Sequence, residues 1–496
     1  MANYPRNLLD LKTRPRVAAP HSDYVSSPLP TFCVVYHSDA AVLGARCVLV
    51  PNQDLVLGRE LEFTDRAGNP CYPLLDPYVS RELGRCMYSA EGFVMTRRPG
   101  ASSIESRNRS LGAENRFELT EDHWYTLNCS NRLVLSLRLE SPSTGDLAAM
   151  DSIVGSNPKI VAMRQTIRRV AATDDDVLIT GPTGAGKEGV ATELHRFSQR
   201  RSGPMVAVNM AALPSELAAA ELFGAEKGAY TGANSSKPGY FRQASGGTLF
   251  MDEIGDAAPQ LQAQLLRALQ TREIQVLGGS TQTVDVRVVA ATELQTNGQD
   301  ASMRQALYHR LSQQQIEVPA LNERLDDLGL LAHHYCQQTG LGPWSTDQDD
   351  TAVASWCQVF VALMAYDWPG NVRELFAVLG QVAVAEGYPR APVLGLKRVQ
   401  EDSGVQATAE PISDQAFLAA LEACDYQVSK LAEHLGMSRQ SIYRRRDKLG
   451  LPRAKDYTRA QVIAALDENN QDLSLAAKAL RVSVAALLHL YPEFGV

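Results

Sequence analysis

A glycine-rich run between residues 181 and 188 has the spacing of a phosphate-binding loop. Glycines let backbone N–H groups turn inward around phosphates at the start of a helix, whose dipole favours anions. Lys187 adds a point charge for the β- and γ-phosphates. The run therefore predicts a binding site for ATP. Its members are Gly181, Pro182, Thr183, Gly184, Ala185, Gly186, Lys187 and Glu188.

Two acidic residues follow an apolar stretch about 60 residues downstream. Asp252 is placed to hold Mg²⁺, directly or through water, and Glu253 is placed to polarise an attacking water. Glu188 stands where many phosphate-binding loops carry Ser or Thr, so no hydroxyl is available there and the metal depends on Asp252 and water. The pair predicts ATP hydrolysis. The alternative, an acidic strand end that caps a helix, is weak after such a loop.

The elements that position these residues alternate between strand and helix. Apolar strand-like runs at 176–181, 205–210, 248–252 and 286–292 are separated by helical patterns. This alternation predicts a parallel sheet covered by helices within residues 151–387. Residues 388–413, which are rich in Pro, Gly and mixed charge, are expected to form a linker.

The N-terminal part has a different pattern. Residues 1–30 are expected to form a flexible arm. Residues 31–140 consist of short apolar runs separated by Gly, Pro, Asn and Asp, which predicts an all-β sandwich.

The C-terminal part is helical by pattern and contains a repeat. Residues 417–451 align without gaps to residues 462–496 at an offset of 45, with eight of 35 pairs identical. The first copy, within 414–453, predicts a helix-turn-helix whose second helix mixes base-reading and phosphate-binding groups. These candidate DNA-binding residues are Ser438, Arg439, Gln440, Ser441, Tyr443, Arg444, Arg445 and Arg446. The second copy, 458–496, lacks nearly all such groups and is expected to serve packing or dimerisation; chance similarity of two Ala/Leu-rich segments is the alternative to duplication.

Consecutive blocks of the chain resemble the AAA+ domain of sigma-54-dependent transcriptional activators. They include GPTGAGKE, ELFGAEKGAYTGA, GGTLFMDEIGD and WPGNVREL, in the family's order. The resemblance implies an α/β core at 151–320, a helical lid at 321–387 and a Fis-type helix-turn-helix. It also implies a loop that contacts sigma-54, with the sequence Gly228, Ala229, Tyr230, Thr231, Gly232 and Ala233.

The same resemblance assigns roles to four further residues. Asn209 corresponds to the residue that couples the γ-phosphate to the loop, and Arg373 to the lid arginine that senses nucleotide. Arg304 and Arg310 correspond to arginine fingers that act on a neighbouring subunit. Sites shared between subunits imply a homo-oligomer, from dimer to hexameric ring.

Four positions depart from the family pattern: Tyr230, Val276, Glu293 and Asn322. Tyr230 replaces Phe and keeps an aromatic face. Glu293 replaces Asn and adds a carboxylate near the γ-phosphate, which could slow hydrolysis. A DNA-binding regulator or repressor with an impaired ATPase is therefore the alternative to an activator. A remodeller of another target is opposed by the GAYTGA sequence.

The N-terminal sandwich resembles a forkhead-associated (FHA) domain, a phosphothreonine-binding β-sandwich. The resemblance rests on Gly58-Arg59 and on residues 76–81, and it implies that Arg59, Ser80 and Arg81 bind phosphate. Leu83 stands where the family carries His. A sandwich that has lost peptide binding, or another all-β sensor, is the alternative.

Composition sets the remaining expectations. The net charge of −8 excludes a globally basic chain, so DNA must be bound by a local patch. The sequence contains no CxxC pair, the spacing that would indicate a zinc site or redox chemistry. Its scattered single cysteines are typical of a protein in the cytoplasm. No apolar run is long enough for a membrane span. Together these features predict an ATP- and Mg²⁺-dependent activator. Its expected partners are upstream DNA, the sigma-54 RNA polymerase holoenzyme and a phosphothreonine protein.

Overall fold

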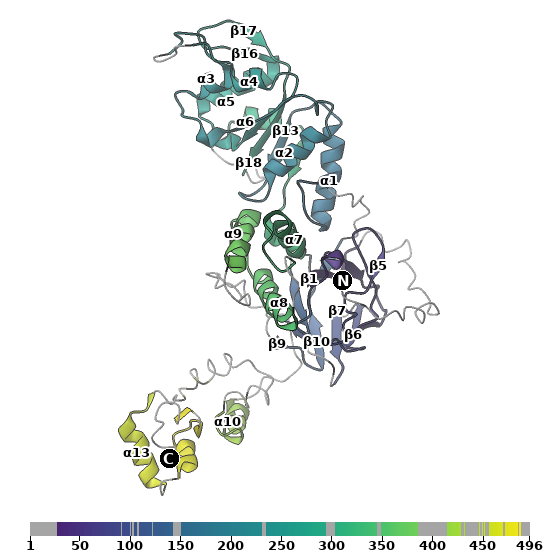
Figure 1. Cartoon of the computed structure of the whole chain (residues 1–496), viewed down its shortest axis with the longest axis vertical. Helices are drawn as coiled ribbons and strands as arrows, with labels where there is room; N and C mark the ends of the chain where they lie inside the picture. The colour runs from purple at the N-terminus through teal and green to yellow at the C-terminus, as the bar shows by residue number, and fades with distance from the viewer. Residues whose placement is uncertain are drawn as a thin grey trace.

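The computed structural model in Figure 1 places a β-sandwich, an α/β core with a helical lid, and a small helical end along the chain. The described residues are 27–90, 92–99, 101, 104–106, 109–121, 123–141, 150–230, 235–293, 303–344, 349–384, 414–427, 431, 446, 449, 451, 456–469, 472–484 and 486–487. The expected arm (1–30, except its last four residues) and the linker at 388–413 lie outside them.

The N-terminal domain consists of two antiparallel sheets, as the short apolar runs separated by Gly, Pro, Asn and Asp predict. One has the strand order β5-β4-β2-β1-β12-β11-β8-β9 and the other β10-β7-β6-β3. Their facing side chains form a continuous apolar core that includes Phe32, Phe93 and Leu127. The strands are β1(Leu29–His37), β2(Arg46–Val48), β3(Leu55–Leu57), β4(Phe63–Thr64), β5(Pro70–Cys71), β6(Gly84–Ser89), β7(Gly92–Arg97), β8(Ile104–Ser106), β9(Arg109–Ser110), β10(Glu114–Phe117), β11(Tyr125–Cys129) and β12(Leu133–Glu140).

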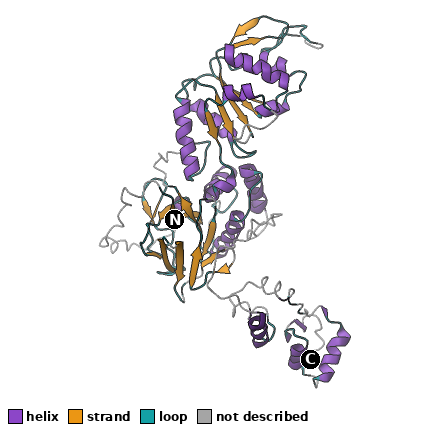
Figure 2. Ribbon diagram, turned by 180° about the vertical axis from the view of Figure 1, so that it is seen from behind, coloured by secondary structure: helices purple, strands orange, loops and turns teal. Residues whose placement is uncertain are grey.

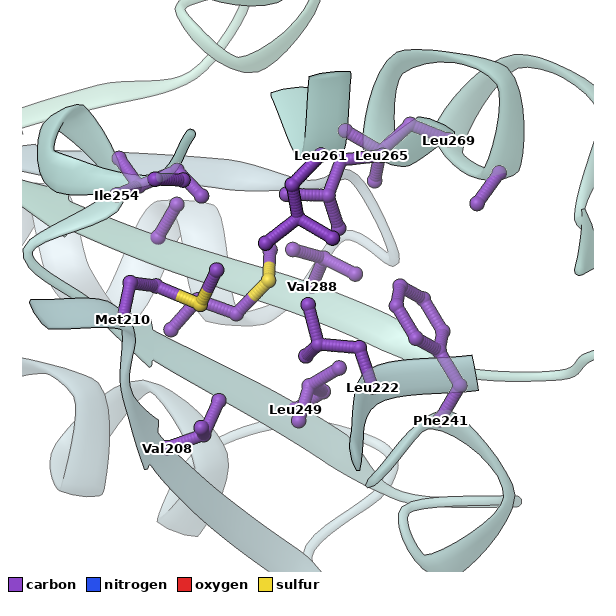
Figure 3. Close-up of a cluster of buried hydrophobic side chains, with 14 of the residues drawn as sticks. Val208, Met210, Leu222, Phe241, Leu249, Ile254, Leu261, Leu265, Leu269 and Val288 are labelled. Atoms are coloured by element: carbon purple, nitrogen blue, oxygen red, sulfur yellow. The ribbon is translucent and has the colours of Figure 1, made fainter. Parts of the chain in front are cut away.

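The core domain is a five-stranded parallel sheet between two layers of helices, which confirms the predicted α/β arrangement. The strand order is β14-β15-β18-β13-β19, with β13(Val177–Thr180), β14(Met205–Asn209), β15(Thr248–Asp252), β18(Arg287–Thr292) and β19(Gln315–Glu317). One face packs on α1(Pro158–Ala171) and α2(Lys187–Arg196). The other packs on α3(Ala218–Phe223), α4(Tyr240–Gln243), α5(Pro259–Thr271) and α6(Gln305–Leu311). Figure 3 shows part of this core, with residues of α3, α4 and α5 facing the sheet.

Two features of the core extend away from the sheet. The hairpin β16(Glu273–Gln275) and β17(Thr281–Thr283) lies at the end of the core opposite the lid (Figures 1 and 2). The lid follows β19 through two 3-10 turns, η6(Leu321–Glu323) and η7(Leu325–Asp327), and contains α7(Leu328–Thr339), α8(Asp350–Met364) and α9(Asn371–Val384). Local sequence sets these ends: the Asp349 side chain caps α8, and Gly340 takes a left-handed conformation after α7.

The sandwich and the lid share one hydrophobic core, which the sequence pattern did not predict. Val35, Tyr36 and Val134 on the outer face of the larger sheet are fully buried in the same cluster as residues of α7 and α8. Both ribbon views show the strands beside the lid helices (Figures 1 and 2). The Tyr36 ring stacks on Phe360 with centroids 4.7 Å apart. The N-terminal domain is therefore packed against the lid helices and is not a separate tethered body in this structure.

The helical end contains α10(Asp414–Ala423), α13(Arg459–Glu468) and α14(Leu473–Ala479). Helix α13 begins and ends 45 residues after α10, at the offset of the sequence repeat. Phe417 and Leu421 are buried in one small cluster, and the aligned Val462 and Leu466 are buried in another. The two copies thus bury the same face of their first helix.

All eight cysteines lie among the described residues and are free thiols. Within the described part of the chain, no helix has the length and apolar character needed to cross a membrane.

Candidate active site

The phosphate-binding loop connects the buried strand β13 to α2. Gly186 caps the helix with a φ of 111°, which a residue with a Cβ adopts only with strain. Gly184 has a φ of 75°, and a Cβ there would lie 2.4 Å from the backbone oxygen of Gly370 in the lid. Glycine at this position therefore lets the lid backbone approach the loop closely.

Lys187 is held at the start of α2 and is only 7% exposed. Its Nζ donates to the backbone oxygen of Gly181 at 3.0 Å and lies 3.8 Å from Oε1 of Glu253. The structure thus brings the lysine of the loop to the acid at the end of β15, although 66 positions separate them in sequence. This arrangement suits a triphosphate bound between a cation and a general base.

The acidic pair lies where β15 ends. Asp252 Oδ1 accepts the N–H of Glu253 at 3.1 Å. Glu253 has a φ of 53°, in the left-handed region, where a non-glycine residue costs about 1–2 kcal/mol. Strain of this kind gathers at functional sites. A carboxylate at Asp252 is a ligand type that Mg²⁺ prefers, so the donor set fits the metal.

The environment of Glu253 raises its pKa above the ordinary value. Burial is the largest cause, since it disfavours the charged form, and Lys187 opposes it. The negative charges of Asp252 and Glu293 raise the pKa further, as does that of Asp256. Glu293, singled out from the sequence as a departure, is therefore close enough to influence the candidate base. A raised pKa brings a carboxylate nearer to the pH at which general bases work best.

Asn209 ends β14 beside Asp252 in the parallel register. Its Oδ1 accepts the N–H groups of Ala211 and Ala212 at 2.9 and 3.2 Å. The side chain is exposed at the same sheet edge as the acidic pair. The structure brings Asn209 to the edge that carries Asp252, and its coupling role stays a prediction.

The three predicted arginines occupy different settings. Arg373 is exposed, and its backbone N–H donates to the Gly184 oxygen at 3.3 Å, which puts it beside the loop. Arg304 is exposed at the start of α6. Arg310 instead bonds within its own subunit, to the Leu269 oxygen at 3.0 Å and to Asp176 at 3.4 Å. Arg304 is therefore exposed to solvent whereas Arg310 is engaged within the chain, and the role of both as arginine fingers stays a prediction.

Two residues without an assigned role in the sequence analysis join the lid to the loop. Asn371 Nδ2 donates to the Thr183 oxygen at 3.0 Å, and its Oδ1 accepts the N–H of Leu321 at 2.8 Å. Arg324 Nη2 donates to the Ala185 oxygen at 3.1 Å, and Arg324 is buried. Asn371 stands inside the WPGNVREL block. The block is part of the family resemblance, but which of its side chains reaches the loop depends on contacts across the fold.

The candidate sigma-contacting loop begins beside the β16–β17 hairpin. Ala225 forms bridges with Lys237 and Leu277, and the N–H of Glu226 donates to the Leu277 oxygen at 2.9 Å. Tyr230 is 36% exposed, although it is a large aromatic residue. Gly228 and Ala229 precede it, while Thr231, Gly232 and Ala233 lie outside the described residues. The described residues at the base of the loop therefore lie beside the β16–β17 hairpin, which Figure 1 shows at the end of the core opposite the lid.

The DNA-binding candidates are described at one position only. Arg446 is 4% exposed and donates from Nη2 to the Arg481 oxygen at 3.3 Å. The Arg446 side chain thus contacts the second repeat in this structure, and its role in DNA binding stays a prediction. The other candidates, which lie outside the described residues, are Ser438, Arg439, Gln440, Ser441, Tyr443, Arg444 and Arg445.

The candidate phosphate site of the sandwich lies between the end of β3 and residues 76–81. A Cβ on Gly58 would lie 2.0 Å from the Arg81 oxygen, so glycine permits this close approach. Arg59 donates to the backbone oxygens of Val79 and, at 2.5 Å, Pro77. Arg81 is exposed and Ser80 half-buried. The structure brings the three predicted residues to one place, with Arg59 holding the loop itself.

Three ranges of the chain match known protein families. Residues 153–317 match the Sigma-54 interaction domain, residues 322–410 the AAA+ ATPase lid domain, and residues 409–449 the Bacterial regulatory protein, Fis family. The transcriptional regulatory protein ZraR of Salmonella typhimurium is 38% identical over 315 residues, which cover 61% of this chain and 69% of ZraR. The chain belongs to the sigma-54 activator family. The AAA+ core, its lid and the Fis-type helix-turn-helix expected from the sequence are confirmed at this level.

Other sigma-54 activators and related structures are similar to this chain. The DNA-binding transcriptional regulator NtrC of Azospirillum brasilense is 41% identical over 280 residues, covering 54% of this chain and 56% of NtrC. A crystal structure of NtrX from Brucella abortus in complex with ATP is 31% identical and covers 60% of this chain and 69% of NtrX, with a TM-score of 0.43. The matched family ranges begin at residue 153, and the FHA-like identity of the sandwich stays a prediction.

Proposed function

We propose that this sigma-54 activator binds DNA upstream of a promoter, hydrolyses ATP as a ring and remodels the closed complex of sigma-54 RNA polymerase. The observation that carries the proposal is the convergence of Lys187, Asp252 and Glu253 at one edge of the parallel sheet. Membership of the family supports sigma-54 as the target. The exposed aromatic side chain of Tyr230 supports a contact made by the loop.

The residues divide the chemistry between them. Backbone N–H groups of residues 181–188 and the Lys187 ammonium hold the phosphates. Asp252 would hold Mg²⁺, which neutralises phosphate charge when bound. Glu253 orients water and accepts its proton. Arg304 of a neighbouring subunit would approach the γ-phosphate, and Arg373 would report nucleotide to the lid.

We propose that the helical end binds DNA and that the N-terminal sandwich binds a regulatory partner. We propose that residues 414–453 contact DNA, and that residues 458–496 are a degenerate second copy that packs on the first. The hydrogen bond from Arg446 Nη2 to the Arg481 oxygen, which joins the two copies, supports this packing. We also propose that Arg59, Ser80 and Arg81 bind a phosphothreonine partner.

Replacing Glu253 with Gln tests the ATPase assignment. We expect Glu253→Gln to abolish hydrolysis while ATP still binds, because the base is lost and Lys187 remains. Glu216→Gln, an exposed acid of the same domain, is the matched control and should retain turnover. Near-normal turnover in the Glu253→Gln chain would contradict the assignment.

A regulator with an impaired ATPase is the second candidate, and Glu293 is the observation that favours it. Its charge acts on Glu253 and would also oppose the phosphates. Steady-state turnover of the unaltered full-length chain separates the two candidates. Absent turnover together with normal ATP binding would favour the impaired regulator, and Glu293→Asn should then restore activity.

A further inference from the structure

The junction between the sandwich, the lid and the start of the core contains a buried charged cluster. Asp326 and Asp327, in the turn that leads into the lid, are 1% and 0% exposed. Arg46 comes from β2 of the sandwich and pairs with Asp326 at 2.6 Å and with Glu140 at 2.9 Å. A buried carboxylate needs such a partner, because desolvation of an unpaired charge is costly.

The same cluster forms hydrogen bonds with the start of the core. Arg46 Nη1 donates to Ser156 Oγ at 2.9 Å. Asn157 Nδ2 donates to Asp326 Oδ1 at 2.7 Å, and the Asn157 backbone N–H donates to Asp327 Oδ1 at 3.0 Å. Asn157 also caps α1, the helix that covers one face of the sheet. The cluster therefore fixes the relative position of three parts of the chain.

The cluster continues to the phosphate-binding loop through one residue. Arg324 directly precedes the acidic turn, and its guanidinium donates to the Val154 oxygen at 3.3 Å and the Ala185 oxygen at 3.1 Å. The position of residues 324–327 thus sets where a carbonyl of the loop is held. Arg46 is connected to that carbonyl by two contacts, its ion pair with Asp326 and the hydrogen bond from Arg324 to the Ala185 oxygen.

The charges in the cluster indicate that the position of the acidic turn depends on Arg46. Burial raises the pKa of Asp327, and the neighbouring charge of Asp326 raises it further. Arg324 and Arg46 oppose this rise. Removing Arg46 would leave two adjacent buried carboxylates with less positive charge, and the turn that carries them would have to move or take up a proton.

We infer that Arg46, a residue of the N-terminal sandwich, is a positioning residue for the ATP site of the core. It acts through Asp326 and the Arg324 contact to Ala185, and it does not touch the nucleotide. The sandwich is accordingly part of the ATPase, whatever ligand it senses. This inference rests on the proposed ATPase function.

Nucleotide binding in the full-length chain tests the inference, with a fluorescent ATP analogue as the probe. Arg46→Gln should raise the Kd about tenfold or more, and the KM for ATP should rise more than kcat falls. Arg46→Lys keeps the charge and should recover most of the affinity. Arg85→Gln is the matched control, since Arg85 is an exposed arginine of the same sandwich that pairs with Asp54 and Glu82.

A charge-balanced double variant separates positioning from a general loss of structure. Asp326→Asn removes the charge that Arg46 compensates, so Arg46→Gln with Asp326→Asn should bind the analogue within about threefold of the unaltered chain. Thermal unfolding reports whether each variant is folded. If Arg46→Gln does not fold, the double variant and Arg46→Lys carry the test, and poor binding by both in a folded state overturns the inference.

The outcomes also distinguish this inference from the proposed function. If the unaltered chain does not bind the analogue, the ATPase proposal fails first. If it binds and folded Arg46→Gln binds equally well, the positioning role is wrong while the ATPase proposal stands.

Discussion

The molecule has two candidate phosphate-binding regions, and they are built differently. In the core, phosphate would be met by backbone N–H groups at the start of α2 and by the buried Lys187. In the sandwich, phosphate would be met by side chains, and Arg59 already holds the backbone oxygens of Pro77 and Val79. A site made of backbone groups is preorganised by the fold, whereas a site made of side chains depends on how one loop is held.

Both regions contact the lid. The core loop meets it through Gly184 and Asn371. Residues 76–81 of the sandwich meet it through Arg132, which pairs with Asp76 at 3.0 Å and with Asp350 of α8 at 2.8 Å. The lid thus lies between the nucleotide site and the candidate phosphothreonine site. Substitutions in each region should therefore separate ligand binding from the positioning of the lid.

The largest effect is expected at the lysine of the core loop. Lys187→Ala should weaken ATP binding by about 10- to 150-fold, since a hydrogen bond to a charged group contributes about 1.5–3 kcal/mol. Titration with a fluorescent ATP analogue measures the effect. Lys159→Ala, which breaks only an exposed ion pair with Glu323, should bind normally. Equal affinity of Lys187→Ala and Lys159→Ala for the analogue would mean that Lys187 does not hold the phosphates.

The next effect concerns the close approach of the lid. Gly184→Ala should weaken ATP binding and lower the unfolding temperature, because the added Cβ meets the Gly370 oxygen at 2.4 Å. Gly246→Ala is the matched control: its φ of 77° carries the same backbone strain, about 1–2 kcal/mol, with nothing within 4 Å of the new Cβ. If both variants lose the same affinity, strain alone explains the result and the lid contact has no special role.

The sandwich should respond differently at its two arginines. Arg59→Ala should lower the thermal stability of the chain and abolish binding of phosphothreonine-containing peptides, because its guanidinium holds residues 76–81. Arg81→Ala should abolish binding with little effect on stability, since Arg81 is exposed. A degenerate phosphothreonine peptide mixture, with its unphosphorylated counterpart as control, is the probe. Absent binding by the unaltered chain would support a sandwich that has lost this activity.

The smallest effect is expected in the pH dependence of hydrolysis. Glu253 acts as a base only when it is deprotonated, and its pKa is raised. As the pH decreases, kcat should therefore begin to fall at a higher pH than it would with an ordinary carboxylate. Glu293→Asn removes one cause of the rise and should shift this acidic limb to lower pH by less than about one unit. A shift to higher pH would mean that Glu293 does not act on Glu253 by charge repulsion.

The sequence by itself determined the elements and the chemistry of the core. The run at 181–188 and the acids after 248–251 are local patterns, since a glycine turn and a buried strand end need no distant partner to be recognised. The alternation of strands and helices predicted the parallel sheet that brings the two motifs to one edge. Short apolar runs separated by turn residues likewise predicted the β-rich N-terminal domain.

Only the tertiary structure decided which groups lie at the boundaries between parts. The burial of Arg446 between the repeats and the pairing of Arg46 with Asp326 join residues that are far apart in sequence. An arginine on an amphipathic pattern looks the same whether it meets solvent, DNA or another part of the chain. Tertiary packing determines which of these environments an arginine has, because a buried guanidinium lies only where a carbonyl or carboxylate from another element is within reach.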